Sequence, residues 1–312
     1  MIGWTLAGTA LGALALAPDA RELARPRIGA AQRAAAAGQF AELPRGTTHY
    51  LWTGSADGGA DAPAAVCIHG LTTPAFVWGP VAAGLARMGF RVLSYDLYGR
   101  GLSDRPGGAQ TMDFFIAQLD DLLAHLGVSG RITVLGYSMG GAIAAAWAAR
   151  HPDRAREAVL IAPAGMGHDL GPVARLVTNH AALGRWLILA FYARSLTRAL
   201  EANRDLDSAI PDIVDRQMAE LRWRGFVPAV WRSMRGILDG DMQAEHRLLA
   251  ARGVPVHAIW AEADAVIQLS GKARLAEWNP AARQTVIPGA THAVTYTHPD
   301  AVLAALTALR RD

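Results

Sequence analysis

The stretch that decides the fold is ITVLGYSMGGAIAAAWAAR, residues 132–150. It begins with a short apolar run typical of a buried strand and passes directly into an alanine-rich run typical of a helix. Ser138 lies at the junction, with one glycine two residues before it and another two residues after it. Glycine removes side chains that would collide in so sharp a turn, so we expect the serine hydroxyl to be exposed there. A Gly-x-Ser-x-Gly sequence can arise by chance in a chain rich in Ala and Gly, but the flanking strand and helix patterns favour a nucleophilic serine.

Composition limits the class of protein. The chain has 312 residues, of which 52% are hydrophobic, enough for one large domain with an extensive core. Its 30 basic and 27 acidic residues nearly balance, and the arginines are scattered, which argues against nucleic-acid binding. The single cysteine, Cys67, excludes an intramolecular disulfide and is expected in the core. No helix-spaced ligand cluster and no phosphate-binding loop is evident, so we expect neither a metal nor a cofactor.

Strand-like and helix-like segments alternate along most of the chain. The expected strands are 48–52, 64–68, 90–95, 132–135, 158–161, 256–260 and 284–287, and the expected helices include 75–88, 112–126, 269–278 and 300–309. Short apolar strands separated by helices predict an α/β fold with a mostly parallel central sheet and helices on both faces.

One interval breaks this alternation. Residues 164–254 contain no convincing strand pattern, and large apolar residues recur at helical spacing. We therefore expect a mainly helical cap inserted into a core formed by residues 47–163 and 255–312. Four aromatic residues of the cap are candidates for lining an apolar substrate pocket, although any one of them could instead pack the cap helices together. They are Trp186, Phe191, Trp223 and Phe226.

Residues 1–46 precede this pattern as an N-terminal apolar segment and a partly helical connector. Residues 2–17 are uncharged and mostly apolar, but they are fewer than the ~20 that cross a bilayer upright. The first arginines follow this run, which disfavours a cleaved signal peptide and, by the positive-inside rule, puts the following domain in the cytoplasm. We expect a membrane-associated protein with a cytoplasmic catalytic domain. The alternatives are a cleaved signal or a helix packed on the domain, in a soluble cytoplasmic or exported protein.

A serine hydroxyl becomes a nucleophile when an imidazole takes its proton. Of the ten histidines, His292 is best placed, because it follows the last expected strand, at the sheet edge that also carries Ser138. A carboxylate must then hold the imidazole in the correct tautomer. Asp264 follows the preceding expected strand and keeps the chain order of serine, acid and histidine. Glu262 and Asp169 are the competing carboxylates.

The negative charge that develops on a substrate's carbonyl oxygen requires backbone N–H donors. Met139 offers one by its position directly after Ser138. The loop after the first core strand carries the sequence HGLT at residues 69–72 and offers the other. The Leu71 amide is the natural candidate there, with Thr72 as an accessory.

With these residues in place, the chain resembles the α/β-hydrolase superfamily, in the branch with a serine nucleophile. The matching stretches are HGL at 69–71, DLYGRGLSD at 96–104, GYSMGG at 136–141, Asp264 and His292. The resemblance implies the α/β-hydrolase fold with a helical cap and a Ser-Asp-His triad. Serine at position 138 disfavours the members that use an aspartate nucleophile.

The expected function is hydrolysis of carboxylic esters through an acyl-enzyme, as in carboxylesterases or monoacylglycerol lipases. The apolar cap points to a small apolar ester as the substrate. The same triad could instead serve a carbon–carbon bond hydrolase of the meta-cleavage type or a perhydrolase or haloperoxidase. A non-catalytic binding protein on a hydrolase scaffold is a further alternative.

Overall fold

A single sheet forms the centre of the computed structural model, which describes residues 14–54, 62–167, 171–238 and 240–308. Within these residues the sheet has eight strands in the order β1-β2-β4-β3-β5-β6-β7-β8. The strands are β1 Gln39–Leu43, β2 Gly46–Thr53, β3 Ala64–Ile68, β4 Arg91–Tyr95, β5 Ile132–Tyr137, β6 Ala155–Ile161, β7 Val256–Ala261 and β8 Arg283–Ile287. Only the β1–β2 and β2–β4 pairs are antiparallel. The expected mostly parallel sheet is confirmed.

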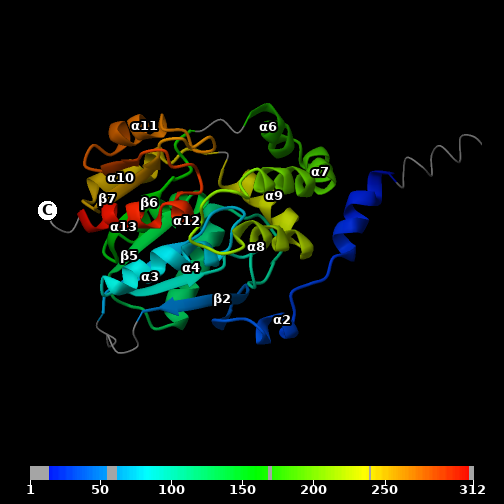
Figure 1. Ribbon diagram of the computed structural model, residues 1–312, viewed down its shortest axis with the longest axis horizontal. Helices are drawn as coiled ribbons and strands as arrows, with labels where there is room; N and C mark the ends of the chain where they lie inside the picture. Colours follow the sequence, from blue (N-terminus) through cyan, green and yellow to red (C-terminus); the bar gives the residue numbers. More distant parts are fainter. Residues whose placement is uncertain (1–13, 55–61, 168–170, 239, 309–312) are drawn as a thin grey trace, which may run out of the picture.

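Helices cover both faces of the sheet (Figure 1). The helices of the core are η2 Ala75–Trp78, α3 Gly79–Arg87, α4 Met112–His125, α5 Met139–Arg150, α10 Gln243–Ala251, α11 Gly271–Trp278, α12 Val294–Thr297 and α13 Pro299–Ala308. Alternate residues of β3 divide between two apolar clusters, since Val66 packs with α4 and α5 while Cys67 packs with α3 and α13. Successive side chains of a strand point to opposite faces, so a strand buried on both sides reads as one apolar run.

Two local features differ from the expectation. The helix expected at 75–88 is divided into η2 and α3. Pro80 lies in the first turn of α3, a position that favours the start of a new helix because proline has no N–H to donate. The expected connector contains a strand, β1, and a short helix, α2 Ala30–Ala34. Strand β1 lies at the edge of the sheet, where only Ala41 and Leu43 are buried. Its apolar alternation is therefore too weak to identify it from the sequence.

The interval between β6 and β7 contains helices and connecting turns but no strand among its described residues. It contains α6 Gly171–Asn179, α7 Ala181–Glu201, α8 Ile213–Ala219, η3 Glu220–Arg222 and α9 Phe226–Gly236, followed by α10. Helices α6, α7 and α9 contact one another and share an apolar cluster of their own (Figure 1). Helix α10 packs on α5 instead and so lies in the core layer.

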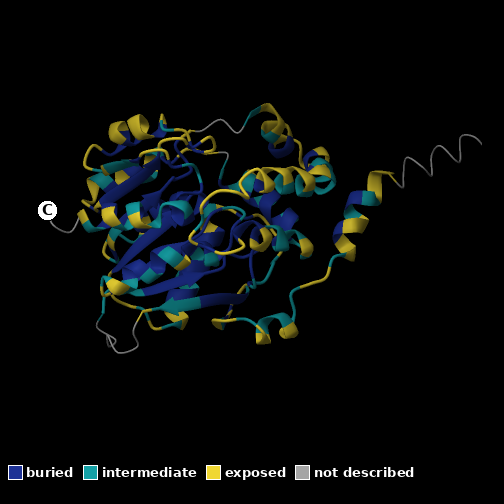
Figure 2. Ribbon diagram, in the orientation of Figure 1, coloured by how far each residue is buried: buried dark blue, intermediate teal, exposed yellow. Residues whose placement is uncertain are grey.

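Burial is concentrated in the centre of the sheet, where strands β3 to β7 are almost wholly buried (Figure 2). The helical residues 14–24 are mostly exposed, but the Glu22 carboxylate accepts a hydrogen bond from Gly225 N at 2.5 Å, and Asp19 pairs with Arg185. The expected membrane-associated localisation is corrected here. In the described ranges no helix has both the length and the apolar character needed to cross a bilayer. Residues 2–13 of the proposed anchor lie outside the described residues.

Candidate active site

Ser138 lies in a strained turn between β5 and α5. Its φ of 55° and ψ of −120° are unusual for a residue with a side chain. Three backbone hydrogen bonds hold this conformation: Ser138 N donates to Ile161 O at 2.9 Å, and Ser138 O accepts from Gly141 N at 2.8 Å and from Ala164 N at 3.0 Å. The turn is therefore fixed by the two strands and the loop around it.

The glycines that flank Ser138 have no room for a side chain. A Cβ on Gly136 would stand 2.0 Å from Gly140 O, and a Cβ on Gly140 would stand 2.1 Å from Ile68 O. Both obstacles are backbone atoms of buried segments, which cannot move aside cheaply. The close approach of α5 to β3 and β5 thus depends on these two positions.

Ser138, His292 and Asp264 form one hydrogen-bonded series. His292 Nε2 lies 3.0 Å from Ser138 Oγ, and His292 Nδ1 lies 2.7 Å from Asp264 Oδ2. Asp264 Oδ1 accepts from Val266 N and Ile267 N, each at 2.8 Å, so the carboxylate is held on both oxygens. A carboxylate only accepts, so His292 Nδ1 donates and His292 Nε2 is left to accept the serine proton. This is the arrangement in which an imidazole can act as a base toward serine.

The loop that carries His292 is tied to the serine turn. Tyr137, the residue before Ser138, donates from its hydroxyl to His292 O at 2.5 Å, and its ring lies 5.2 Å from the imidazole. The competing carboxylate Glu262 accepts from Gly289 N at 2.9 Å and thereby shapes the start of this loop. Asp169, the other competitor, lies outside the described residues.

Of the two candidate N–H donors, Leu71 lines the same cavity as Ser138, and Met139 follows Ser138 directly in the chain. Met139 is the first residue of α5, so its N–H has no acceptor within the helix. Gly70, Leu71 and Thr72 line a cavity of about 240 Å³ together with Ser138 and His292. The cavity therefore brings the loop after β3 to the serine.

His69 orients the first peptide of that loop. Its Nε2 accepts from Leu97 N at 2.9 Å, so the proton is on Nδ1, which donates to Gly70 O at 2.8 Å. Burial lowers the pKa of His69 to about 4 and keeps the ring neutral. Because the C=O and N–H of a trans peptide point in opposite directions, holding Gly70 O fixes the direction of Leu71 N–H.

Of the four aromatic residues expected around the substrate, none lines the cavity beside Ser138. Phe226 is fully buried in the cluster of α6, α7 and α9, where it packs these helices together. Trp186 and Trp223 are partly buried, and Trp186 makes an edge contact with Phe191 at 6.0 Å between ring centres. Only Phe191 lines an apolar groove of about 440 Å³ on the surface of these helices.

Met234, on α9, lines both the cavity beside Ser138 and the apolar groove. The groove is otherwise lined by Val173, Ala174, Val177, Leu187, Ile188, Phe191, Tyr192 and Ser195. The sequence alone gives no reason to select Met234, since a lone methionine on a helix is usually a packing residue. Its role at the junction depends on the position of α9 over the sheet.

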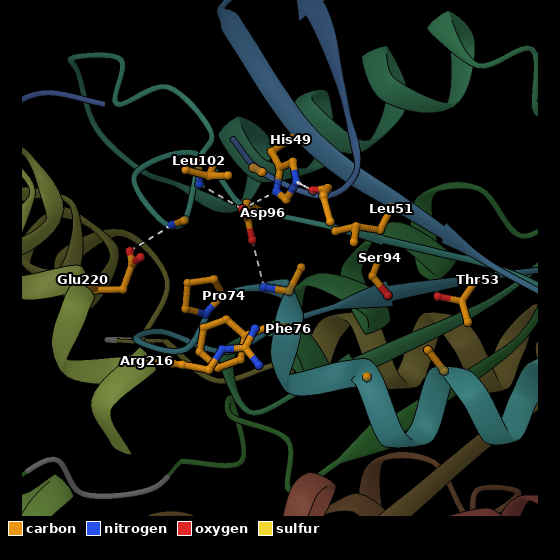
Figure 3. A pocket seen from close by; sticks show the side chains of 16 residues that line it. His49, Leu51, Thr53, Pro74, Phe76, Ser94, Asp96, Leu102, Arg216 and Glu220 are labelled. Atoms are coloured by element: carbon orange, nitrogen blue, oxygen red, sulfur yellow. Dashed lines mark hydrogen bonds and ion pairs between the residues drawn. The ribbon is translucent and has the colours of Figure 1, made fainter. Parts of the chain in front are cut away.

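A separate cavity of about 330 Å³ contains none of Ser138, His292 and Asp264 (Figure 3). Asp96 lies at its wall and joins three segments, because it accepts from Ala75 N at 2.8 Å, from Leu102 N at 2.9 Å and from His49 Nδ1 at 2.7 Å. His49 Nε2 faces Ala37 O at 2.8 Å. Burial is the largest single influence and would lower the pKa of His49, but the hydrogen bond to Asp96, the charge of Asp96 and the bond to Ala37 O together outweigh burial and raise the pKa. Asp96 therefore fixes the loop at 96–104 in place.

Comparisons with known proteins agree on the fold. The family model of the alpha/beta hydrolase fold matches residues 63–299. An uncharacterized protein of Mycobacterium tuberculosis is 28% identical over 217 residues, 66% of this chain but only 62% of that protein, so the chain spans less than two thirds of that relative's length. A pimeloyl-[acyl-carrier protein] methyl ester esterase of Chromobacterium violaceum is 31% identical over 251 residues, 78% of this chain and 92% of its own. The crystal structure of a hydrolase from Pseudomonas aeruginosa matches with a TM-score of 0.70 and 26% identity, over 88% of this chain and 98% of its own.

Proposed function

Since the chain belongs to the α/β-hydrolase family, we propose that it is a serine hydrolase that cleaves carboxylic esters. The observation that carries this proposal is the series from Ser138 Oγ through His292 to Asp264, with separations of 3.0 and 2.7 Å. The series needs no metal or cofactor to activate the serine. Among the described residues, no group of three or more His, Cys, Asp or Glu side chains could hold a metal ion.

In the first half of the reaction, Ser138 Oγ attacks the ester carbonyl carbon while its proton passes to His292 Nε2. The carbonyl electron pair moves onto oxygen, and the N–H groups of Met139 and Leu71 bind the resulting anion. Asp264 stabilises the imidazolium that His292 has become. The tetrahedral intermediate then collapses, the bond to the alcohol oxygen breaks, and His292 Nε2 gives its proton to the departing alcohol. The acyl group remains on Ser138.

In the second half, a water molecule takes the place of the alcohol. His292 Nε2 removes a proton from the water, and the water oxygen attacks the acyl carbonyl carbon. The bond to Ser138 Oγ breaks, and His292 returns the proton to the serine. The products are a carboxylic acid and the unchanged enzyme.

The apolar surfaces next to Ser138 support an ester with an apolar acyl chain, of the monoacylglycerol type. Met234 joins the cavity beside the serine to the groove on α6, α7 and α9. Val173 and Phe191 at this groove are 73% and 54% exposed. Exposed apolar side chains gathered around a groove are typical of a binding surface.

The test is hydrolysis of p-nitrophenyl butyrate and decanoate by the full chain, by Ser138→Ala and by the control Ser270→Ala, which removes an exposed hydroxyl. We expect the first substitution to abolish turnover and the control to keep it. A fluorophosphonate probe should label the parent and the control but not Ser138→Ala. Full activity of Ser138→Ala would refute the proposal. Turnover of a vinylogous diketone, or of peroxide and halide, with no ester hydrolysis would replace it by carbon–carbon bond hydrolysis or perhydrolysis.

A further inference from the structure

Arg100 is a fully buried cation that the proposed mechanism leaves without a role. It lies in the loop after β4, and burial lowers its pKa, although arginine starts so far above neutrality that the charge remains. A buried guanidinium is costly unless acceptors satisfy its N–H groups. Here they are uncharged oxygens: Leu71 O at 2.9 Å, Tyr98 O at 3.0 Å, Gln110 Oε1 at 2.8 Å and Ser233 Oγ at 2.8 Å.

One of these bonds reaches the loop that faces Ser138. Arg100 Nε donates to Leu71 O, which belongs to the same planar peptide as Thr72 N–H. The preceding peptide is held in the same way, because His69 Nδ1 donates to Gly70 O. Two successive N–H groups, those of Leu71 and Thr72, are thus fixed through the carbonyls of their own peptides.

Another bond reaches α9. Arg100 Nη2 donates to Ser233 Oγ, and the Ser233 hydroxyl donates to Gln110 Oε1 at 2.6 Å, which closes a ring of three fully buried side chains. The next residue on α9 is Met234, at the wall of the cavity beside Ser138. The same loop has a second contact with this region, since Gly101 N donates to Glu220 of η3 at 2.9 Å (Figure 3).

We propose that Arg100 is a positioning residue that couples the seating of α9 to the loop at residues 71–72, which carries the oxyanion donor Leu71 N–H and the accessory Thr72 N–H. When α9 is in place, Ser233 holds one end of the guanidinium and the other end holds Leu71 O. Displacement of α9 removes the Ser233 acceptor and frees the guanidinium to leave Leu71. Its effect on catalysis rests on the proposed function, whereas the coupling itself does not.

The coupling is tested by amide hydrogen exchange in Ser233→Ala, which alters α9 and leaves residues 70–73 unchanged. Exchange at residues 70–73 should become faster by roughly tenfold, the factor that about 1.4 kcal/mol of lost hydrogen bonding produces in a local opening equilibrium. Arg100→Lys should have the same effect, because a lysine cannot reach Leu71 and Ser233 together in a fixed fork. Ser233→Thr, which keeps a hydroxyl, should restore the parent rate.

The matched control is Arg105→Lys. Arg105 is a second mostly buried arginine. It follows the loop at residues 96–104 that carries Arg100, and it donates to Ser103 O at 2.9 Å and to Gly101 O at 3.1 Å. This control should leave exchange at residues 70–73 as in the parent. If Arg105→Lys accelerated exchange at residues 70–73 as much as the test variants do, the cause would be a general loosening of the loop at residues 96–104, and the proposal would be overturned.

Kinetics on p-nitrophenyl esters test the catalytic consequence. Ser233→Ala and Arg100→Lys should lower kcat by roughly ten- to a hundredfold with KM nearly unchanged, since oxyanion donors act in the transition state. Their affinity for an alkyl boronic acid, which forms a tetrahedral adduct, should fall in parallel. Unchanged exchange at residues 70–73 in both variants would overturn the coupling. Faster exchange with unchanged kcat would overturn the catalytic role. An inactive parent with faster exchange in the variants would refute the ester hydrolase but uphold the coupling.

Discussion

Replacing Glu220 with glutamine should stabilise the protein at alkaline pH and have no effect in acid. Glu220 is 7% exposed, it accepts from Gly101 N at 2.9 Å, and its nearest cation, Arg105 Nη2, is 3.7 Å away. Burial raises the pKa of Glu220 from its ordinary 4.5 to about 7, because Arg105 offsets only part of the cost of desolvation. At a pH below the pKa that Glu220 has in the unfolded chain, its carboxyl is protonated in both the folded and the unfolded state. No charge is then buried on folding, so Glu220 does not lower the free energy of unfolding.

Between the two pKa values the folded protein binds more protons than the unfolded chain, so the free energy of unfolding falls as pH rises. Above the folded pKa the full penalty is present. The difference between the pKa values corresponds to roughly 3 kcal/mol, at about 1.4 kcal/mol per pH unit. Glutamine can still accept from Gly101 N and does not ionise, so Glu220→Gln should recover up to this amount near pH 8, less the lost attraction to Arg105.

The measurement is urea unfolding of parent and variant near pH 4 and near pH 8, with the linear extrapolation used for both. Glu277→Gln, on the exposed side of α11, is the matched control and should follow the parent at every pH. A stability difference that is the same in acid and in alkali would contradict the reasoning, and so would a variant that is less stable near pH 8.

Three further substitutions test other features of the site. Asp264→Asn should lower kcat by roughly 10⁴-fold without unfolding the protein, because the amide donates to His292 Nδ1 and reverses the tautomer of the imidazole. Measurements of kcat and of the ¹⁵N spectrum of the imidazole check this. A spectrum that shows the parent's tautomer in the variant would count against it. Gly140→Ala should prevent stable folding, since its Cβ would stand 2.1 Å from a carbonyl oxygen of β3, whereas Gly130→Ala, with open space around its Cβ, should fold normally; melting temperatures compare the two. Met234→Trp should fill the space where the cavity beside Ser138 meets the groove, and so lower kcat/KM for p-nitrophenyl decanoate relative to butyrate by roughly tenfold. An unchanged ratio of the two kcat/KM values would show that the acyl chain does not bind in the groove.

The sequence predicted the turn at Ser138 well because its causes are local. Two glycines, an apolar run before them and a helical run after them all lie within a few residues of the serine. His292 and Asp264 could be predicted from chain order, since the carboxyl ends of parallel strands share one edge of the sheet. Strand β1 could not, because an edge strand with two buried residues has almost no apolar signature.

The substrate side of the site depended on packing between distant segments. Phe226 is a large apolar residue of the kind that lines substrate pockets. The position of α9 places it in the apolar cluster of α6, α7 and α9, and places Met234 at the cavity beside Ser138. The proposed role of Arg100 likewise cannot be predicted from the sequence of its own loop, because its partners Leu71 and Ser233 come from two other parts of the chain. No periodicity specifies which of several apolar helix faces meets which loop.

Cys67, buried on β3, has a practical consequence for solution experiments. It is the only cysteine of the chain, it is fully shielded from solvent, and burial raises the pKa of its thiol. Thiol reagents attack the thiolate, so the parent protein should remain unlabelled under native conditions. Cysteines introduced at Leu183 on α7 and at Arg87 on α3 would then carry spin or fluorescent labels without any background. The distance between the two labels would show directly whether α7 moves relative to α3, in a chain otherwise free of reactive sulfur.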